Sequence, residues 1–240
     1  MQKPPSGPVH LQRLPAHRHW LTVAVVLAVA VITVGLAVQW VPGFTSAELA
    51  VDQGFSRHHI PVLTGLALAL NLLFGPVAGA LMVLATSLYL VLIRRSPPKA
   101  VLFALTAGSG WLTCQLFKVV IGRIRPDPDL LLDPLVPEPV SNSFPSGHTS
   151  LAVALALAAY FLSRGSRAEK PVLWIGTGLA VIVAWSRVYI GAHYPLDVVA
   201  SFPATLAAVV LMAGLWNRYA PSVFARLQST SSSRSRRSPQ

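Results

Sequence analysis

The chain has 240 residues, of which 53% are hydrophobic and only 11% are charged. Soluble globular domains carry about 25% charged residues, so this composition argues against a soluble domain and indicates a polytopic membrane protein. The formal net charge is +11, but the basic residues lie in short stretches between apolar runs and in the two tails. No basic stripe is interleaved with aromatic residues in a soluble segment, which argues against nucleic acid as a partner. The single cysteine, Cys114, lies in an apolar run and rules out an intramolecular disulfide.

Residues 1–19 are polar and are expected to form a cytoplasmic tail. The following run, 20–40, has a tryptophan at each end and is long enough to span about 30 Å of hydrocarbon. A cleaved signal peptide is the alternative, but its apolar region is normally about 7–15 residues long, so a retained first span is favoured. Residues 41–60 contain two acids, an arginine and two histidines and are expected to form an aqueous loop.

The apolar stretch 61–93 is too long for one span and is interrupted by Gly75-Pro76. We expect a short helix at 61–74, lying on the membrane or dipping into it, and then a span at 77–93. The fold class predicted is therefore all-α, a six-transmembrane-helix bundle with a short extra interfacial helix. The remaining spans are expected at 100–121, 148–163, 172–190 and 196–216, so that the membrane domain covers 20–216 and a disordered basic, Ser-rich cytoplasmic tail covers 217–240.

The distribution of basic residues predicts the orientation. With the N-terminus in the cytoplasm, both tails and the turns at 94–99 and 164–170 lie inside, and they hold 14 of the 19 Lys and Arg residues. This is the bias that the positive-inside rule describes, and the plasma membrane is the expected location. Five cations remain outside, and four of them lie near the outer ends of adjoining spans: Lys118, Arg123, Arg125 and Arg187.

Three clusters fall on this outer face. The first runs from Lys118 to Pro126, and its cations could also be anchors to lipid headgroups. The second is Pro-Ser-Gly-His-Thr at 145–149, where a helix N-terminus with a hydroxyl and a glycine can bind an anion, although an ordinary helix cap is equally compatible. The third is the stretch 186–197, in which His193 and Asp197 are four residues apart and share one face if a helix begins nearby.

Together the clusters supply three cations, backbone donors, two histidines and one carboxylate. Arginine offers bidentate hydrogen bonds to a phosphate dianion, so the set indicates phosphate chemistry. No group of carboxylates for a two-metal site is present nearby, and a zinc site made from His148 and His193 would lack a third ligand, so no metal and no cofactor are expected.

The motifs Lys-x6-Arg-Pro (118–126), Pro-Ser-Gly-His (145–148) and Ser-Arg-x5-His-x3-Asp (186–197) resemble the three-part signature of the type 2 phosphatidic acid phosphatase superfamily. These integral-membrane lipid phosphatases are related to vanadium haloperoxidases. The resemblance covers roughly residues 77–216, and no motif position departs from the pattern.

The resemblance implies a role for each motif residue. His193 would be the nucleophile that forms a phosphohistidine, Asp197 would orient it, and His148 would act as general acid on the leaving oxygen. Arg123 is ranked as a lesser contact. The groups expected to hold the phosphoryl oxygens are Lys118, Arg125, Ser146, Gly147 and Arg187.

A lipid substrate is expected because the clusters lie at headgroup depth. Phosphatidic acid, phosphatidylglycerol phosphate and undecaprenyl diphosphate are all compatible with the motifs. Three other interpretations stay open: a phosphotransferase with the same site, an anion-binding transporter, and a structural membrane scaffold that would leave the outer cations unexplained.

Overall fold

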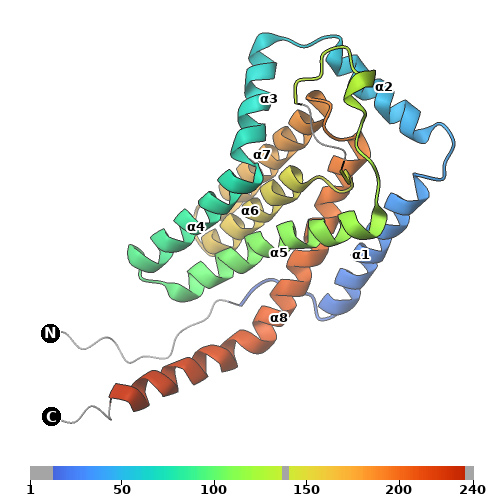
Figure 1. The fold of residues 1–240 in the computed structure, drawn as a ribbon. Coiled ribbons are helices and arrows are strands. Elements are labelled where there is room, and N and C mark those ends of the chain that lie inside the picture. Colours follow the sequence, from blue (N-terminus) through green and yellow to red (C-terminus); the bar gives the residue numbers. More distant parts are fainter. Residues whose placement is uncertain (1–12, 137–140, 236–240) are drawn as a thin grey trace.

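The computed structural model describes residues 13–136 and 141–235 of the chain. In these residues the regular structure is helical, apart from one isolated bridge between Ile124 and Asn142. Eight α-helices and one short 3-10 turn follow one another along the described chain (Figure 1): α1 Trp20–Ala37, α2 Phe44–Ser56, α3 Pro61–Leu73, α4 Pro76–Leu92, α5 Pro97–Ile121, η1 Pro128–Leu130, α6 Gly147–Ser163, α7 Glu169–Tyr189 and α8 Pro195–Ser235.

Proline and glycine set most of the helix ends. Proline is the first residue of α3, α4, α5 and α8, where its missing N–H has no helical partner to lose and its fixed φ suits the helix. At the other end of α5, Gly122 adopts a left-handed conformation with φ 66° and its N–H donates to the carbonyl of Lys118. This glycine cap stops α5 and turns the chain back toward the bundle.

Helix α6 lies at the centre of the bundle and packs against α5, α7 and α8 (Figure 1). Small residues on α6, including Ala152, Ala154 and Ala158, are buried and let the neighbouring helices approach closely. Helix α1 packs along α8, where an added Cβ at Gly214 would overlap the Trp20 ring. The charged and polar side chains that matter below lie at one end of this bundle.

By length and hydropathy, four described helices can cross a membrane: α1, α5, α7 and the part of α8 from Pro195 to Arg226. Helices α3 and α4 are joined at a 62° bend and can together form a fifth span. The chain is therefore an all-helical, multi-pass membrane protein. The six-span count is not confirmed, because α6 is apolar but only 17 residues long.

Two segments differ from the sequence-based expectation. Residues 44–56, expected to be an aqueous loop, form helix α2, which lies across the end of the bundle and buries Glu48, Asp52 and Ser56 (Figure 1). Helix α8 also continues to Ser235, past residue 216 and into the tail expected to be disordered. In this extension Ala220 and Phe224 pack with Trp216. Apolar residues one turn apart therefore continue the buried face of α8 beyond residue 216.

Candidate active site

The three sequence clusters meet because of the direction in which the helices run. The C-terminal end of α5 carries Lys118, and the N-terminal end of α6 carries His148. The C-terminal end of α7 carries Arg187, and the N-terminal end of α8 carries Asp197. Two connections, 122–146 and 190–194, lie at the same end of the bundle and supply Arg125 and His193.

His193 is fully buried in the short connection between α7 and α8. Its Nε2 lies 3.1 Å from Nη1 of Arg125. A guanidinium can only donate, so Nε2 accepts this hydrogen bond and the neutral ring carries its proton on Nδ1. Nδ1 lies 3.4 Å from Oδ2 of Asp197, which is an electrostatic contact rather than a well-formed hydrogen bond.

The surroundings keep His193 neutral. Burial lowers the pKa of His193 well below its usual range, because a charged imidazolium loses its hydration there. The cations Arg125, Arg187 and Lys118, with His148, lower the same pKa further. A neutral imidazole whose Nε2 lone pair faces cations is able to attack an electrophilic phosphorus.

Asp197 is fully buried and its two oxygens have different partners. Oδ1 accepts a hydrogen bond of 2.8 Å from Nη1 of Arg123, and Oδ2 accepts one of 3.1 Å from the backbone N–H of Tyr194. The carboxylate is thus held on one side by a cation while its other oxygen faces the His193 ring. The predicted pairing of His193 with Asp197 has a matching geometry.

Lys118 and Arg125 are tied to the segment that leads into α6. Nζ of Lys118 donates to the carbonyl of Asn142 at 2.7 Å, and the Asn142 side chain donates back to the carbonyl of Lys118 at 2.9 Å. Nε of Arg125 donates to Oγ of Ser141 at 2.9 Å, and its Nη1 donates to the carbonyl of Ala192 at 2.8 Å. These bonds fix both cations beside His193.

Asn71 of α3 joins Arg187 to His148. Its side-chain Oδ1 accepts a hydrogen bond from Nη1 of the fully buried Arg187. Its backbone carbonyl lies 3.1 Å from Nε2 of His148. Because a carbonyl oxygen only accepts, Nε2 of His148 carries a proton and Nδ1 is the ring nitrogen that can take up another.

Ser146 caps α6 rather than lining a cavity. Its Oγ accepts from the hydroxyl of Thr149 at 3.2 Å, and its own N–H donates to Oγ of Ser201 at 3.0 Å. The side chain of Ser146 is fully buried, whereas Gly147 and His148 line a cavity. The phosphate-binding role of Ser146 stays a prediction, as do the roles of the other motif residues.

The cavity beside these residues has a volume of about 590 Å³ and is lined by both polar and apolar residues. Apolar side chains of α3, α4 and α5 form the rest of its lining. Its polar and charged lining residues are Asn71, Gln115, Lys118, Arg125 and His148.

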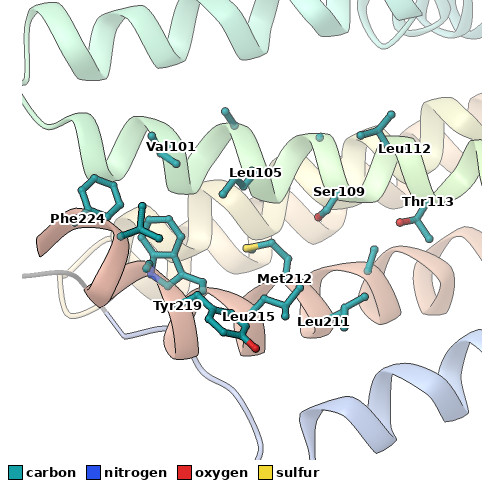
Figure 2. Close-up of a pocket in the computed structure, with 16 residues that line it drawn as sticks. Val101, Leu105, Ser109, Leu112, Thr113, Leu211, Met212, Leu215, Tyr219 and Phe224 are labelled. Atoms are coloured by element: carbon teal, nitrogen blue, oxygen red, sulfur yellow. The ribbon is translucent and has the colours of Figure 1, made fainter. Parts of the chain in front are cut away.

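A second cavity, of about 660 Å³, lies between α5 and α8 (Figure 2). Its lining is apolar apart from hydroxyls such as those of Ser109, Thr113 and Tyr219, and no charged residue lines it. Phosphate recognition requires cations or convergent donors, so of these two cavities the one beside Lys118 and Arg125 has the suitable chemistry.

Three polar residues of this region were missed in the sequence. Asn71 is a lone amide in an apolar helix, which is itself a signal of function. Glu48 and Asp52 are four residues apart, but they lie in a segment interpreted as a loop. Both are buried on α2, and neither oxygen of Asp52 has a hydrogen-bond partner among the described residues. Burial, and then the neighbouring Asp197 and Glu48, raise the pKa of Asp52 to about 8.

Comparison with known proteins finds relatives named as phosphatases. The chain is 38% identical to phosphatidylglycerophosphatase B of Bacillus subtilis over 118 residues, which are 47% of this chain and 56% of that protein. It is 29% identical to the undecaprenyl-diphosphatase BcrC of Bacillus subtilis over 163 residues, 68% of this chain and 77% of that protein. The chain spans only about half the length of phosphatidylglycerophosphatase B and of several other curated relatives it matches.

One solved structure is also similar. It is the crystal structure of a transmembrane PAP2-type phosphatidylglycerolphosphate phosphatase from Bacillus subtilis, with a TM-score of 0.70 and 27% sequence identity. The similarity covers 82% of this chain and 96% of that one. The sequence model of the PAP2 superfamily matches residues 99–220, the segment in which all three motifs lie, and the chain belongs to this superfamily.

Proposed function

We propose that the protein is a metal-independent lipid phosphatase that hydrolyses a phosphate ester or diphosphate through a phosphohistidine at His193. The observation that carries this proposal is the orientation of the buried imidazole. Its Nε2 lone pair faces the guanidinium of Arg125 at 3.1 Å, and its Nδ1 faces Asp197 at 3.4 Å. A phosphoryl group drawn to the cations would therefore meet the nucleophilic nitrogen.

In the first step Nε2 of His193 forms a bond to phosphorus while the bond from phosphorus to the leaving oxygen breaks. Nδ1 keeps its proton, and Asp197 stabilises the positive charge that develops on the ring. His148 would give a proton from Nδ1 to the leaving oxygen once the ring carries a proton on both nitrogens, since its Nε2 donates to the carbonyl of Asn71.

Arg125 has to loosen its hold on His193 during this step. Its Nη1 occupies the Nε2 lone pair, and an incoming phosphate dianion offers that guanidinium a stronger, charged acceptor. Lys118, Arg187 and the N–H of Gly147 would share the remaining phosphoryl oxygens. Water then attacks the phosphohistidine, with His148 taking up a proton, and inorganic phosphate is released.

The shape of the cavity favours a lipid as substrate. Lys118 and Arg125 line it together with Leu72, Val77 and Leu81, whose apolar side chains are strongly exposed. The headgroup phosphate can thus enter while its acyl or prenyl chains stay in the bilayer. Relatives named for phosphatidylglycerophosphate and undecaprenyl diphosphate support these classes, and phosphatidic acid is compatible with the same site.

We place the site on the extracytoplasmic side of the plasma membrane, with both termini in the cytoplasm. The support is the positive-inside bias, since 14 of the 19 Lys and Arg residues lie in the tails and in the two turns on the other side.

The test is phosphate release by purified protein from a panel of lipid phosphates in EDTA. We expect activity in EDTA, an acid-labile ³²P label on the wild-type protein after quenching, and loss of both in His193→Ala. His58→Ala, which changes an exposed histidine, is the matched control and should behave like the wild type.

Three results would contradict the proposal. Activity that requires added Mg²⁺ would end the metal-free mechanism. Label that appears in a second lipid or sugar instead of in inorganic phosphate would make the protein a phosphotransferase, and phosphate flux retained by His193→Ala would indicate a transporter.

A further inference from the structure

We propose that Glu48 of α2 is a positioning residue for the reaction, acting on the His193–Asp197 pair through Arg123. This inference rests on the proposed function of the same site. Helix α2 lies outside residues 99–220, the segment matched by the superfamily, so the family motifs do not include this residue.

Glu48 joins the loop after α5 to the start of α8. Its Oε2 accepts a hydrogen bond of 2.5 Å from Nη2 of Arg123, and its Oε1 accepts one of 2.6 Å from the backbone N–H of Leu196. Glu48 is only 7% exposed, and Arg123 only 2%. A buried carboxylate with a cation on one oxygen and a helix N–H on the other fixes both partners in place.

Arg123 passes this restraint to Asp197. Its Nη1 donates to Oδ1 of Asp197 at 2.8 Å, and its guanidinium lies over the Tyr194 ring with 4.2 Å between Cζ and the ring centroid. Arg123 was expected to be a lesser phosphate contact, but it is not among the residues that line the phosphate cavity. Its contacts assign it to the support of Asp197 instead.

The charges explain why Glu48 matters for chemistry and not only for folding. Arg123 lies between two carboxylates, so its positive charge is divided between Glu48 and Asp197. Without the charge of Glu48, Arg123 would neutralise Asp197 more completely, and Asp197 would stabilise a cationic His193 less well. Without Arg123, the two carboxylates would stabilise the cationic ring more strongly.

The groups that face this pair come from every neighbouring element. Carboxylates, the phenol and the cation Arg123 lie near Asp197, whereas the other cations and His148 lie near His193. The titratable and charged groups are Glu48 and Asp52 of α2, Lys118 of α5, Arg123 and Arg125 of the following loop, His148 of α6, Arg187 of α7 and Tyr194 beside His193.

The experiment measures the pH dependence of kcat/KM with short-chain phosphatidic acid for Glu48→Gln, Arg123→Gln and the double variant. The acid limb should move to lower pH in Glu48→Gln and to higher pH in Arg123→Gln, by about one pH unit each, and should return toward the wild type in the double variant. We expect kcat to fall about 10-fold or more in Glu48→Gln, while KM changes little, because Glu48 does not line the phosphate cavity.

Gln53→Ala is the control on the same helix, since Gln53 donates to the carbonyl of Leu130 at 3.0 Å and not to the Glu48 network. It should keep the wild-type profile. If Glu48→Gln does not fold, the comparison of Arg123→Gln with the double variant tests the inference instead. The acid limb of kcat/KM in the double variant must then lie at lower pH than in Arg123→Gln, because the negative charge of Glu48 has been removed.

Losses of kcat without opposite shifts of the acid limb would make Glu48 merely structural and overturn the inference. A wild-type profile in Glu48→Gln would do the same. Failure of the proposed function is distinct, because then the wild-type protein would release no phosphate at all.

Discussion

At the scale of single residues, the buried acids near the site differ in their partners. Glu48 and Asp197 both contact the guanidinium of Arg123. Asp52, on the same face of α2 as Glu48, is fully buried, and neither of its oxygens has a hydrogen-bond partner in the described residues. Its pKa is raised to about 8, first by burial and then by Asp197 and Glu48, so it is protonated at neutral pH.

The raised pKa of Asp52 predicts a pH-dependent loss of stability. The group is neutral in the folded protein up to about pH 8 but ionises near its ordinary pKa of 3.8 in the unfolded chain. The unfolded state therefore binds fewer protons across this window, and the free energy of unfolding falls as pH rises, by at most about 1.4 kcal/mol per pH unit. The contribution of Asp52 to the free energy of unfolding is fully present below the pKa that this group has in the unfolded chain, and it is lost as the pH approaches 8.

Asp52→Asn removes this titration. We expect the variant to match the wild type near pH 4 and to exceed it in thermal unfolding temperature increasingly between pH 5 and pH 8, by an amount of order the linkage slope above. Asp129→Asn, at an exposed acid, is the control and should show no such trend. A difference in unfolding temperature that stays constant with pH would show that Asp52 is ionised in the folded protein.

Several individual positions could be predicted from the sequence because their motif spacing is local. His193 and Asp197 are four residues apart, and Lys118 and Arg125 flank a short turn, so their proximity follows from the chain itself. The contact of Asn71 with Arg187 joins residues 116 positions apart, and no local pattern reports it. The same holds for Glu48 and Leu196, which are 148 positions apart.

At the scale of elements, the termini of α5 and α8 place the reactive groups. Gly122 ends α5 with φ 66°, and an added Cβ there would meet no atom within 4 Å. A substitution at Gly122 is therefore strained by backbone conformation alone, at about 1–2 kcal/mol for an ordinary L-residue. The turn it forms leads directly to Arg123 and Arg125.

Gly122→Ala should lower the free energy of unfolding by about 1–2 kcal/mol and reduce kcat, because both arginines follow the strained turn. Thermal unfolding and phosphate release, measured on the same preparation, test this. Gly108→Ala is the matched control within α5, since its added Cβ is equally free of contacts and its φ is helical, so it should be neutral or slightly stabilising. Equal effects of the two substitutions would rule out the left-handed cap as the cause.

The helix boundaries next to proline and glycine could be predicted closely. The expected short helix at 61–74 is α3, Pro61–Leu73, and the expected span at 77–93 is α4, Pro76–Leu92. Helix α2 could not be found by the same reasoning, which treats acidic residues as solvent-facing. Both of its acids are instead buried, and Glu48 accepts hydrogen bonds from Arg123 and from the N–H of Leu196 at the start of α8.

At the scale of the whole molecule, the connections that carry the candidate site and the turn between α6 and α7 lie at opposite ends of the bundle of described helices. The connections 122–146 and 190–194, which carry Arg125 and His193, lie at one end, and the turn between α6 and α7 lies at the other. The N-terminal part of the described chain lies at this second end too, because Leu14 and Asn217 exchange two hydrogen bonds of 2.9 Å. The candidate site and the contact between Leu14 and Asn217 thus lie at opposite ends of the bundle.

Single cysteines can test which face is which. Leu132, 76% exposed in the loop after η1, should become accessible as Leu132→Cys to a membrane-impermeant maleimide added to intact cells. Ala168→Cys, in the exposed turn before α7, should be labelled only after permeabilisation. The native Cys114 is 1% exposed and contributes little background, which the wild-type chain measures directly. Labelling of Ala168→Cys but not of Leu132→Cys in intact cells would reverse the orientation. The phosphate site would then face the cytoplasm, and the basic turns would lie outside, against the charge bias that motivated the assignment.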